Sequence, residues 1–312
     1  MNVIAIYNIK GGVGKTTTAV NLSYMAAADG RRVLLWDLDL QAASTFALRV
    51  RPRVAGFGKK SLESGEAFTA AIKETDYDNL DLLPADFAYR KFDRLLGELG
   101  KPAHVLAALL TTLGRDYDVV ILDCPPGFSL IAEGIFAAAD VVLVPTIPTV
   151  LSLRTVARII KWADGADSPS HLAAFFSMVD RRKALHRCAS DWIATHSEVF
   201  LNSEIPYASV VEQMTVRRTP LGVFAPRDPA TSAFARLWAE LQTRVLRQRR
   251  EEQAPSRQRR AIHLRAIKAL ITQLESVGTH DIVAPTRAIV RTSSREQDSR
   301  HVVGCSDDAG TA

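Results

Sequence analysis

The chain has 312 residues, 47% of them hydrophobic, and a formal net charge of +5. This composition is typical of a soluble globular protein, and the length allows one large α/β domain or two smaller ones. No apolar run reaches the roughly 18 residues that span a bilayer, and the first residues lack the basic segment of a signal peptide. The three cysteines, Cys124, Cys188 and Cys305, are too few and too far apart for a disulfide framework or a zinc motif, which favours a reducing compartment such as the cytoplasm.

The first predicted elements are a buried strand over 3–7 and a helix over 16–28, joined by a glycine-rich turn. Backbone N–H groups of such a turn, at the N-terminus of a helix, cradle phosphate oxygens. Lys15 can reach the β- and γ-phosphates, and the Thr16 hydroxyl can ligate Mg²⁺. The expected nucleotide-binding residues of the turn are Lys10, Gly11, Gly12, Val13, Gly14, Lys15, Thr16 and Thr17.

Acidic residues follow two further predicted strands. The strand 33–36 leads into Asp37 and Asp39, and the strand 119–122 ends at Asp123. The carboxyl edge of a parallel sheet is where α/β folds bind ligands. An aspartate in the position of Asp123, a Walker B strand, bonds the Mg²⁺ shell, usually through water. We expect its neighbour Cys124 to be a small buried side chain and not a redox group.

Strands and helices alternate along the rest of the chain. Strands are expected at 80–84, 141–145 and 173–179, and helices at 61–73, 87–99, 102–113, 151–163, 185–196, 210–218 and 228–250. This alternation predicts an α/β fold, a mostly parallel sheet with helices on both faces.

The turn 10–17, which carries a lysine at each end of its glycines and Ile9 where the usual P-loop has its first glycine, resembles the deviant Walker A loop of the ParA/MinD family of ATPases. Residues 37–41 and 123–126 resemble the two switch segments of that family, with Leu40 in place of a usual proline. The resemblance covers about residues 2–245. It implies a P-loop NTPase domain over 1–250, with ATP and Mg²⁺ as cofactors.

The resemblance also implies roles for individual residues. Lys10 would reach the ATP bound by a second subunit, so that a homodimer sandwiches two nucleotides. Asp39 would position the attacking water and help to hold the metal. The implied catalytic residues are Lys10, Lys15 and Asp39; the implied metal residues are Thr16, Asp39 and Asp123; and an Ile-Pro segment places Pro206 and Tyr207 beside the adenine ring.

ParA-type relatives imply a homodimer that binds DNA without sequence preference in its ATP state and partitions DNA or positions a protein cargo. Its slow ATP hydrolysis would be stimulated by a ParB-like or cargo-adaptor protein, and it would be cytoplasmic and associated with the nucleoid. The candidate DNA contacts are Arg217, Arg218, Arg247 and Arg250, for which a merely solvated basic surface is the competing interpretation.

Residues 251–312 form an extension beyond this domain. The excess positive charge lies from Arg244 onward, where 13 basic residues face 8 acidic ones. We expect a basic linker, an amphipathic helix over about 257–277 and a disordered segment from 278 onward. The apolar side of the helix is expected to contain Ile262, Ile267, Leu270, Ile271 and Leu274. This helix either packs on the body, binds a partner or, as in a MinD-like alternative, lies on a membrane surface without stable insertion. A third alternative is a metabolic relative, either an iron–sulfur reductase, which the cysteines disfavour, or an amide-forming synthetase.

Overall fold

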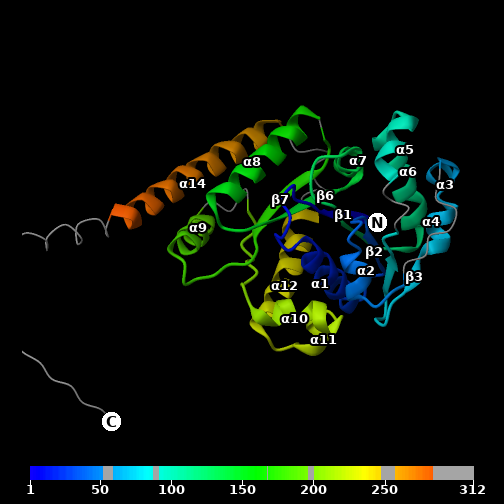
Figure 1. The fold of residues 1–312 in the computed structure, drawn as a ribbon, viewed down its shortest axis with the longest axis horizontal. Helices are drawn as coiled ribbons and strands as arrows, with labels where there is room; N and C mark the ends of the chain where they lie inside the picture. Colours follow the sequence, from blue (N-terminus) through cyan, green and yellow to red (C-terminus); the bar gives the residue numbers. More distant parts are fainter. Residues whose placement is uncertain (52–58, 87–90, 167, 196–199, 247–256, 284–312) are drawn as a thin grey trace, which may run out of the picture.

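The computed structural model describes residues 1–51, 59–86, 91–166, 168–195, 200–246 and 257–283. Its centre is a seven-stranded sheet in the order β3-β4-β2-β5-β1-β6-β7 (Figure 1). Every neighbouring pair is parallel except β3 and β4. The strands are β1 (Asn2–Ile6), β2 (Val33–Asp37), β3 (Lys73–Glu74), β4 (Leu80–Leu83), β5 (Val119–Asp123), β6 (Val141–Thr146) and β7 (His171–Phe176). The predicted α/β architecture is therefore confirmed.

Alternate side chains of the central strands enter two separate cores, because successive residues of a strand point to opposite faces. Ile4 and Ile6 of β1 belong to the core beneath α1 (Lys15–Ala28) and α12 (Pro229–Glu240). Val3 and Ala5 belong to the core on the other face. That second face is covered by α3 (Lys59–Ser64), α4 (Glu66–Ala71), α5 (Phe92–Leu99), α6 (Pro102–Leu113), α7 (Leu130–Ala138), α8 (Val150–Gly165), α9 (Ala184–Thr195) and α14 (Arg257–Val283).

Several predicted helices have different bounds in the structure. The helix expected over 61–73 is split into α3 and α4 at Gly65, whose φ of 75° suits a residue without a Cβ. The helix expected over 87–99 begins at Phe92, and residues 87–90 lie outside the described part. The helix expected over 228–250 ends at Glu240 and continues as a π-helical segment, η3 (Leu241–Leu246). Shorter elements are α2 (Ala43–Ala47), η2 (Gly114–Asp116), α10 (Ser209–Arg217) and α11 (Leu221–Phe224).

The helix α14 packs on the body of the protein, as one of the sequence interpretations proposed. It lies along α8 and beside α9 (Figure 1). Its buried residues, Arg260, His263, Ile267, Leu270 and Leu274, recur every three to four positions along one side. The expected apolar side is thus only partly right, because Ile262 is 42% exposed. Residues 278–283, expected to be disordered, continue the helix, and residues after 283 lie outside the described part.

We predict that Leu270→Ala destabilises the protein by about 2–5 kcal/mol, because it leaves a cavity where a fully buried side chain joins α14 to the main core. The measurement is the free energy of unfolding from a urea titration. Ile262→Ala, on the exposed side of the same helix, is the matched control and should change this free energy by no more than about 0.5 kcal/mol. Equal effects of the two substitutions would mean that α14 does not pack as described.

Candidate functional site

The glycine-rich turn lies at the carboxyl edge of the sheet, between β1 and α1. Gly12 and Gly14 have φ angles of 70° and 89°, a conformation that residues with a Cβ rarely adopt. Gly14 is the residue immediately before α1, so the free N–H groups of the first helical turn open onto the loop. The backbone of residues 11–17 therefore has the form of an anion cradle.

The two lysines of the turn differ in their surroundings. Lys15 is 7% exposed, and its Nζ donates to the carbonyl of Lys10 at 3.3 Å. Burial lowers the pKa of Lys15, while the carboxylates of Asp123 and Asp39 oppose that shift. Lys10 is exposed; its Nζ lies 3.5 Å from the hydroxyl of Ser152 at the start of α8. Lys15 thus points into the cradle, and Lys10 lies across its rim.

Asp123 ends β5 and is fully buried. Its Oδ2 accepts a 2.7 Å hydrogen bond from the Ser44 hydroxyl. Its Oδ1 is buried and lacks a hydrogen-bond partner among the described residues. Burial raises the pKa of Asp123, and the nearby hydroxyls of Ser44 and Thr16 lower it. An unsatisfied buried carboxylate oxygen beside a hydroxyl suits a hydrated Mg²⁺, so the residues present fit that ion.

Asp37 and Asp39 occupy different positions at the end of β2. Asp37 is buried and pairs in sheet register with Asp123, and its Oδ2 accepts bonds from the backbone and the hydroxyl of Thr45. Burial, followed by the neighbouring Asp123, raises the pKa of Asp37. Asp39 is only half-buried and accepts a bond from the backbone N–H of Gln41. The side chain of Asp39 is thus accessible at the edge of the cradle, whereas Asp37 fixes the loop.

A small pocket lies at the far side of the cradle. Its lining residues are Gly14, Thr17, Thr18, Ser177, Met178, Ile205, Pro206, Tyr207, Ala208, Val211, Glu212 and Phe234. Backbone bonds of Val179 to Ile205 and Tyr207 hold this wall in place. The structure therefore brings Pro206 and Tyr207, about 190 residues from the glycine-rich turn, next to Gly14 and Thr17.

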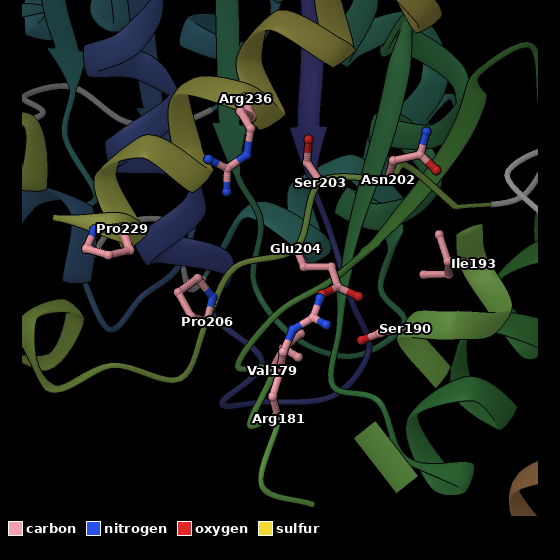
Figure 2. Close-up of a pocket in the computed structure, with 10 residues that line it drawn as sticks. All are labelled: Val179, Arg181, Ser190, Ile193, Asn202, Ser203, Glu204, Pro206, Pro229 and Arg236. Carbon is pink, nitrogen blue, oxygen red and sulfur yellow. The ribbon is translucent and has the colours of Figure 1, made fainter. Parts of the chain in front are cut away.

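A larger pocket of about 720 Å³ lies on the other side of Pro206 (Figure 2). Arg181 and Glu204 form a 2.7 Å ion pair within it, and Arg236 enters from α12. The Ser190 hydroxyl, which has no hydrogen-bond partner among the described residues, turns from α9 toward this ion pair. This pocket contains none of the glycines of the cradle.

The predicted DNA-contacting arginines are only partly described. The Arg218 guanidinium stacks on the Phe46 ring at 4.5 Å and donates to its carbonyl, and Arg217 lies 5.0 Å from the Phe224 ring. Both side chains are already engaged in contacts that hold α10 against neighbouring segments. Arg247 and Arg250 lie outside the described residues.

This chain is similar to known proteins over most of its length. The AAA domain family model matches residues 1–168. The chromosome-partitioning ATPase Soj of Thermus thermophilus is 32% identical over 78% of this chain and 96% of its own length. The chain belongs to the ParA/MinD superfamily. The chromosome partitioning protein ParA of Caulobacter vibrioides is 29% identical, covering 81% of this chain and 97% of that protein.

The same fold occurs in a solved structure of cobyrinic acid a,c-diamide synthase from Mycobacterium smegmatis with a bound ATP analogue and magnesium. Its TM-score is 0.67 at 26% identity, covering 82% of this chain and 99% of that one. The relatives are thus matched almost completely, whereas about a fifth of this ParA/MinD chain has no counterpart in them.

Several residues that line or support the candidate nucleotide site of this ParA/MinD chain were not predicted from the sequence. Ser44, Thr45 and Ser152 hold Asp123, Asp37 and Lys10 respectively. A serine or threonine after a strand is too common to single out. Met178, with a φ of 54°, forms part of the small pocket and carries no sequence signal either. Among the described residues, no helix is long and apolar enough to cross a membrane.

Proposed function

We propose that this chain is an ATP-driven dimeric switch that binds DNA non-specifically while ATP is bound and partitions DNA or positions a cargo. The observation that carries the proposal is the pairing of a buried Lys15 inside the glycine cradle with a second, exposed Lys10 at its rim. One lysine serves the nucleotide of its own subunit. The other is exposed and would leave Ser152 to serve the nucleotide of a partner, in the manner of an arginine finger supplied in trans.

The remaining residues have roles within that site. The backbone of residues 11–17 and Lys15 bind the phosphates, and Pro206 and Tyr207 border the base. Thr16 and Asp123, with Asp39 at the edge, would hold Mg²⁺, which would supply charge neutralisation on the phosphates. Asp39 orients the attacking water. Catalysis then rests on positioning and charge stabilisation within residues 1–250, without a covalent intermediate.

Exposed apolar side chains around the cradle support a dimer. Leu40, Phe128 and Leu151 are 47%, 45% and 68% exposed, and they follow β2, β5 and β6 respectively. Together with β1 these strands form the continuous run β2-β5-β1-β6 of the sheet, and they end at the same edge as the cradle. Large apolar residues gathered at a polar edge are typical of a protein interface. We infer that a second copy covers this edge when ATP is present.

Two alternatives are less well supported. A MinD-like membrane anchor would need a free apolar side on α14, but Ile267, Leu270 and Leu274 are buried in the core. An amide-forming synthetase shares the fold at 26% identity, yet Soj and ParA, which are 32% and 29% identical to this chain, are named for chromosome partitioning. We propose that the chain acts in the cytoplasm in association with the nucleoid, and that a ParB-like or cargo-adaptor protein stimulates hydrolysis.

The deciding experiment measures binding to a random-sequence DNA duplex with ATP, with ADP and without nucleotide. We expect Asp39→Ala, which removes the side chain that orients water, to retain ATP and to bind DNA for much longer than the unchanged protein. ADP should abolish this binding. Anionic liposomes are tested in parallel, and ATP-dependent binding to liposomes but not to DNA would contradict the proposal in favour of the membrane alternative.

A further inference from the structure

The helices α8 and α14 together contain eight basic and three acidic residues, a net charge of +5. This equals the net charge of the whole chain, so all the other residues together are neutral. Charge concentrated on one two-helix unit creates a local positive potential that attracts polyanions. This concentration is not visible from the sequence, because about 90 residues separate the two helices.

The two helices run antiparallel. Arg154, near the start of α8, forms a 3.2 Å ion pair with Glu275, near the end of α14. At the other end of the pair, Arg260 donates to the carbonyls of Ala163 and Ser168 and lies 3.9 Å from Asp164. These contacts fix the register of one helix against the other.

This register places like charges opposite each other. Residues seven positions apart lie two turns along the same side of a helix. Two turns beyond Arg154 on α8 is Lys161, and two turns before Glu275 on α14 is Lys268. Lys161 and Lys268 therefore face each other across the boundary, with Arg158 one turn from Lys161. All three are exposed, as is Arg265 on α14.

The acidic groups around this boundary do not neutralise it. Glu275 is paired with Arg154, and Asp164 lies beside Arg260. No carboxylate within the described part of the chain forms an ion pair with Arg158, Lys161, Arg265 or Lys268. Like charges opposite each other cost free energy in the absence of a counter-ion, so this arrangement is stabilised by bound anion.

We propose that the exposed face formed by Arg158, Lys161, Arg265 and Lys268, the α8–α14 basic face, binds the phosphate backbone of duplex DNA. This inference rests on the proposed function, in which DNA is a partner, and assigns it a surface. The row on α8, from Arg158 to Lys161, runs for about 5 Å along the helix and lies about 8–10 Å from the row on α14. Two such rows reach phosphates on both sides of a groove about 12 Å wide.

A duplex suits this face better than a membrane does. The apolar side of α14 is buried in the core. Among the residues described on that helix, Ile262 is the one large apolar residue that is strongly exposed. The face therefore offers charge without a group to insert among lipid tails. It also exists in a single subunit, so ATP would increase affinity by joining two faces in one dimer, through multivalency and not by creating new contacts.

The test uses the full-length protein with Asp39→Ala, which holds the ATP state, and a random-sequence duplex. The variant carries Arg158→Ala, Lys161→Ala and Lys268→Ala. We expect its affinity to fall on the order of 10- to 100-fold, and the slope of log affinity against log salt to fall by about 2.7 per face between about 50 and 200 mM. The variant with Arg158→Lys, Lys161→Arg and Lys268→Arg should bind as before.

The matched control removes three exposed charges elsewhere, with Lys73→Ala, Lys101→Ala and Arg115→Ala. Lys73 belongs to β3, Lys101 immediately precedes α6 and Arg115 lies in η2, which follows α6. The elements β3 and α6 lie on the opposite side of the molecule from α14 (Figure 1). Their loss should leave the salt slope within about one unit of the starting value. Thermal unfolding and ATP binding, measured on every variant, confirm that each is folded.

The outcomes separate this inference from the function on which it rests. If the Asp39→Ala protein binds DNA and loss of the three basic side chains changes neither affinity nor slope, the α8–α14 basic face is excluded and the proposed function stands. An equal loss in the control variant also overturns the inference, because the effect is then one of net charge alone. If the Asp39→Ala protein binds no DNA with any nucleotide, the proposed DNA partner is wrong and the inference fails with it.

Discussion

Replacing Lys15 with alanine is expected to lower the rate of ATP hydrolysis by at least about 1,000-fold and to remove detectable ATP binding. Lys15 is the one lysine whose ammonium group is buried inside the cradle, where it donates to the Lys10 carbonyl and lies near Asp123. A charge in a dry site interacts more strongly with phosphate than it would in water. Single-turnover hydrolysis and fluorescent nucleotide titration measure the two effects.

The control for this prediction separates binding from folding. Without Lys15 the buried carboxylates near the cradle lose their cation, which by itself lowers stability. Lys15→Met keeps most of the side-chain volume, and its unfolding free energy is measured beside that of the alanine variant. Wild-type ATP binding by a folded Lys15→Met protein would show that this residue is not the phosphate lysine.

Replacing Lys10 with alanine is expected to preserve ATP binding and to abolish the ATP-dependent dimer, with hydrolysis reduced about 1,000-fold. Lys10 makes its side-chain contact with Ser152, 3.5 Å away, and is exposed at the rim of its own cradle. Its loss therefore leaves the phosphate cradle of its own subunit intact. Sedimentation with ATP, performed on the Asp39→Ala background, reports the dimer directly.

Ser152→Ala is the matched control, because it removes the partner of Lys10 but retains the lysine. We expect it to dimerise with ATP at least as well as the Asp39→Ala protein, since Lys10 is then released from its own subunit. Dimerisation that survives Lys10→Ala would mean that the second lysine of the loop does not act across subunits. Loss of ATP binding in the Lys10→Ala variant would instead place this residue in its own site.

Much of the site could be predicted because its chemistry is local in the sequence. Glycines between a strand and a helix, and aspartates after apolar strands, place Lys15 and Asp123 at one sheet edge without knowledge of any distant contact. The hydroxyls that orient these groups could not be predicted. Ser44 and Asp123 are 79 residues apart, and Lys10 and Ser152 are 142 apart.

The fold was predictable to a similar degree. The alternation of strands and helices gave the parallel sheet, but the break at Gly65 and the π-helical segment after Glu240 depend on packing. The periodicity of the sequence predicted the helix α14. It did not predict that this helix packs against α8 and α9. Two of the five residues assigned to its apolar side, Ile262 and Ile271, are not fully buried. The buried side of the helix, which we call its seam, instead includes Arg260 and His263.

The seam of α14 sets a limit on where this chain can be shortened. Val156, Ile159 and Ile160 of α8 line a small cavity that His263 closes, and Trp192 of α9 belongs to the same core as Leu270. A truncation after residue 246, which approximates the length of the relatives, would open this apolar strip to water. Such a shortened protein would self-associate through the strip, and that assembly would need to be distinguished from the ATP-dependent dimer.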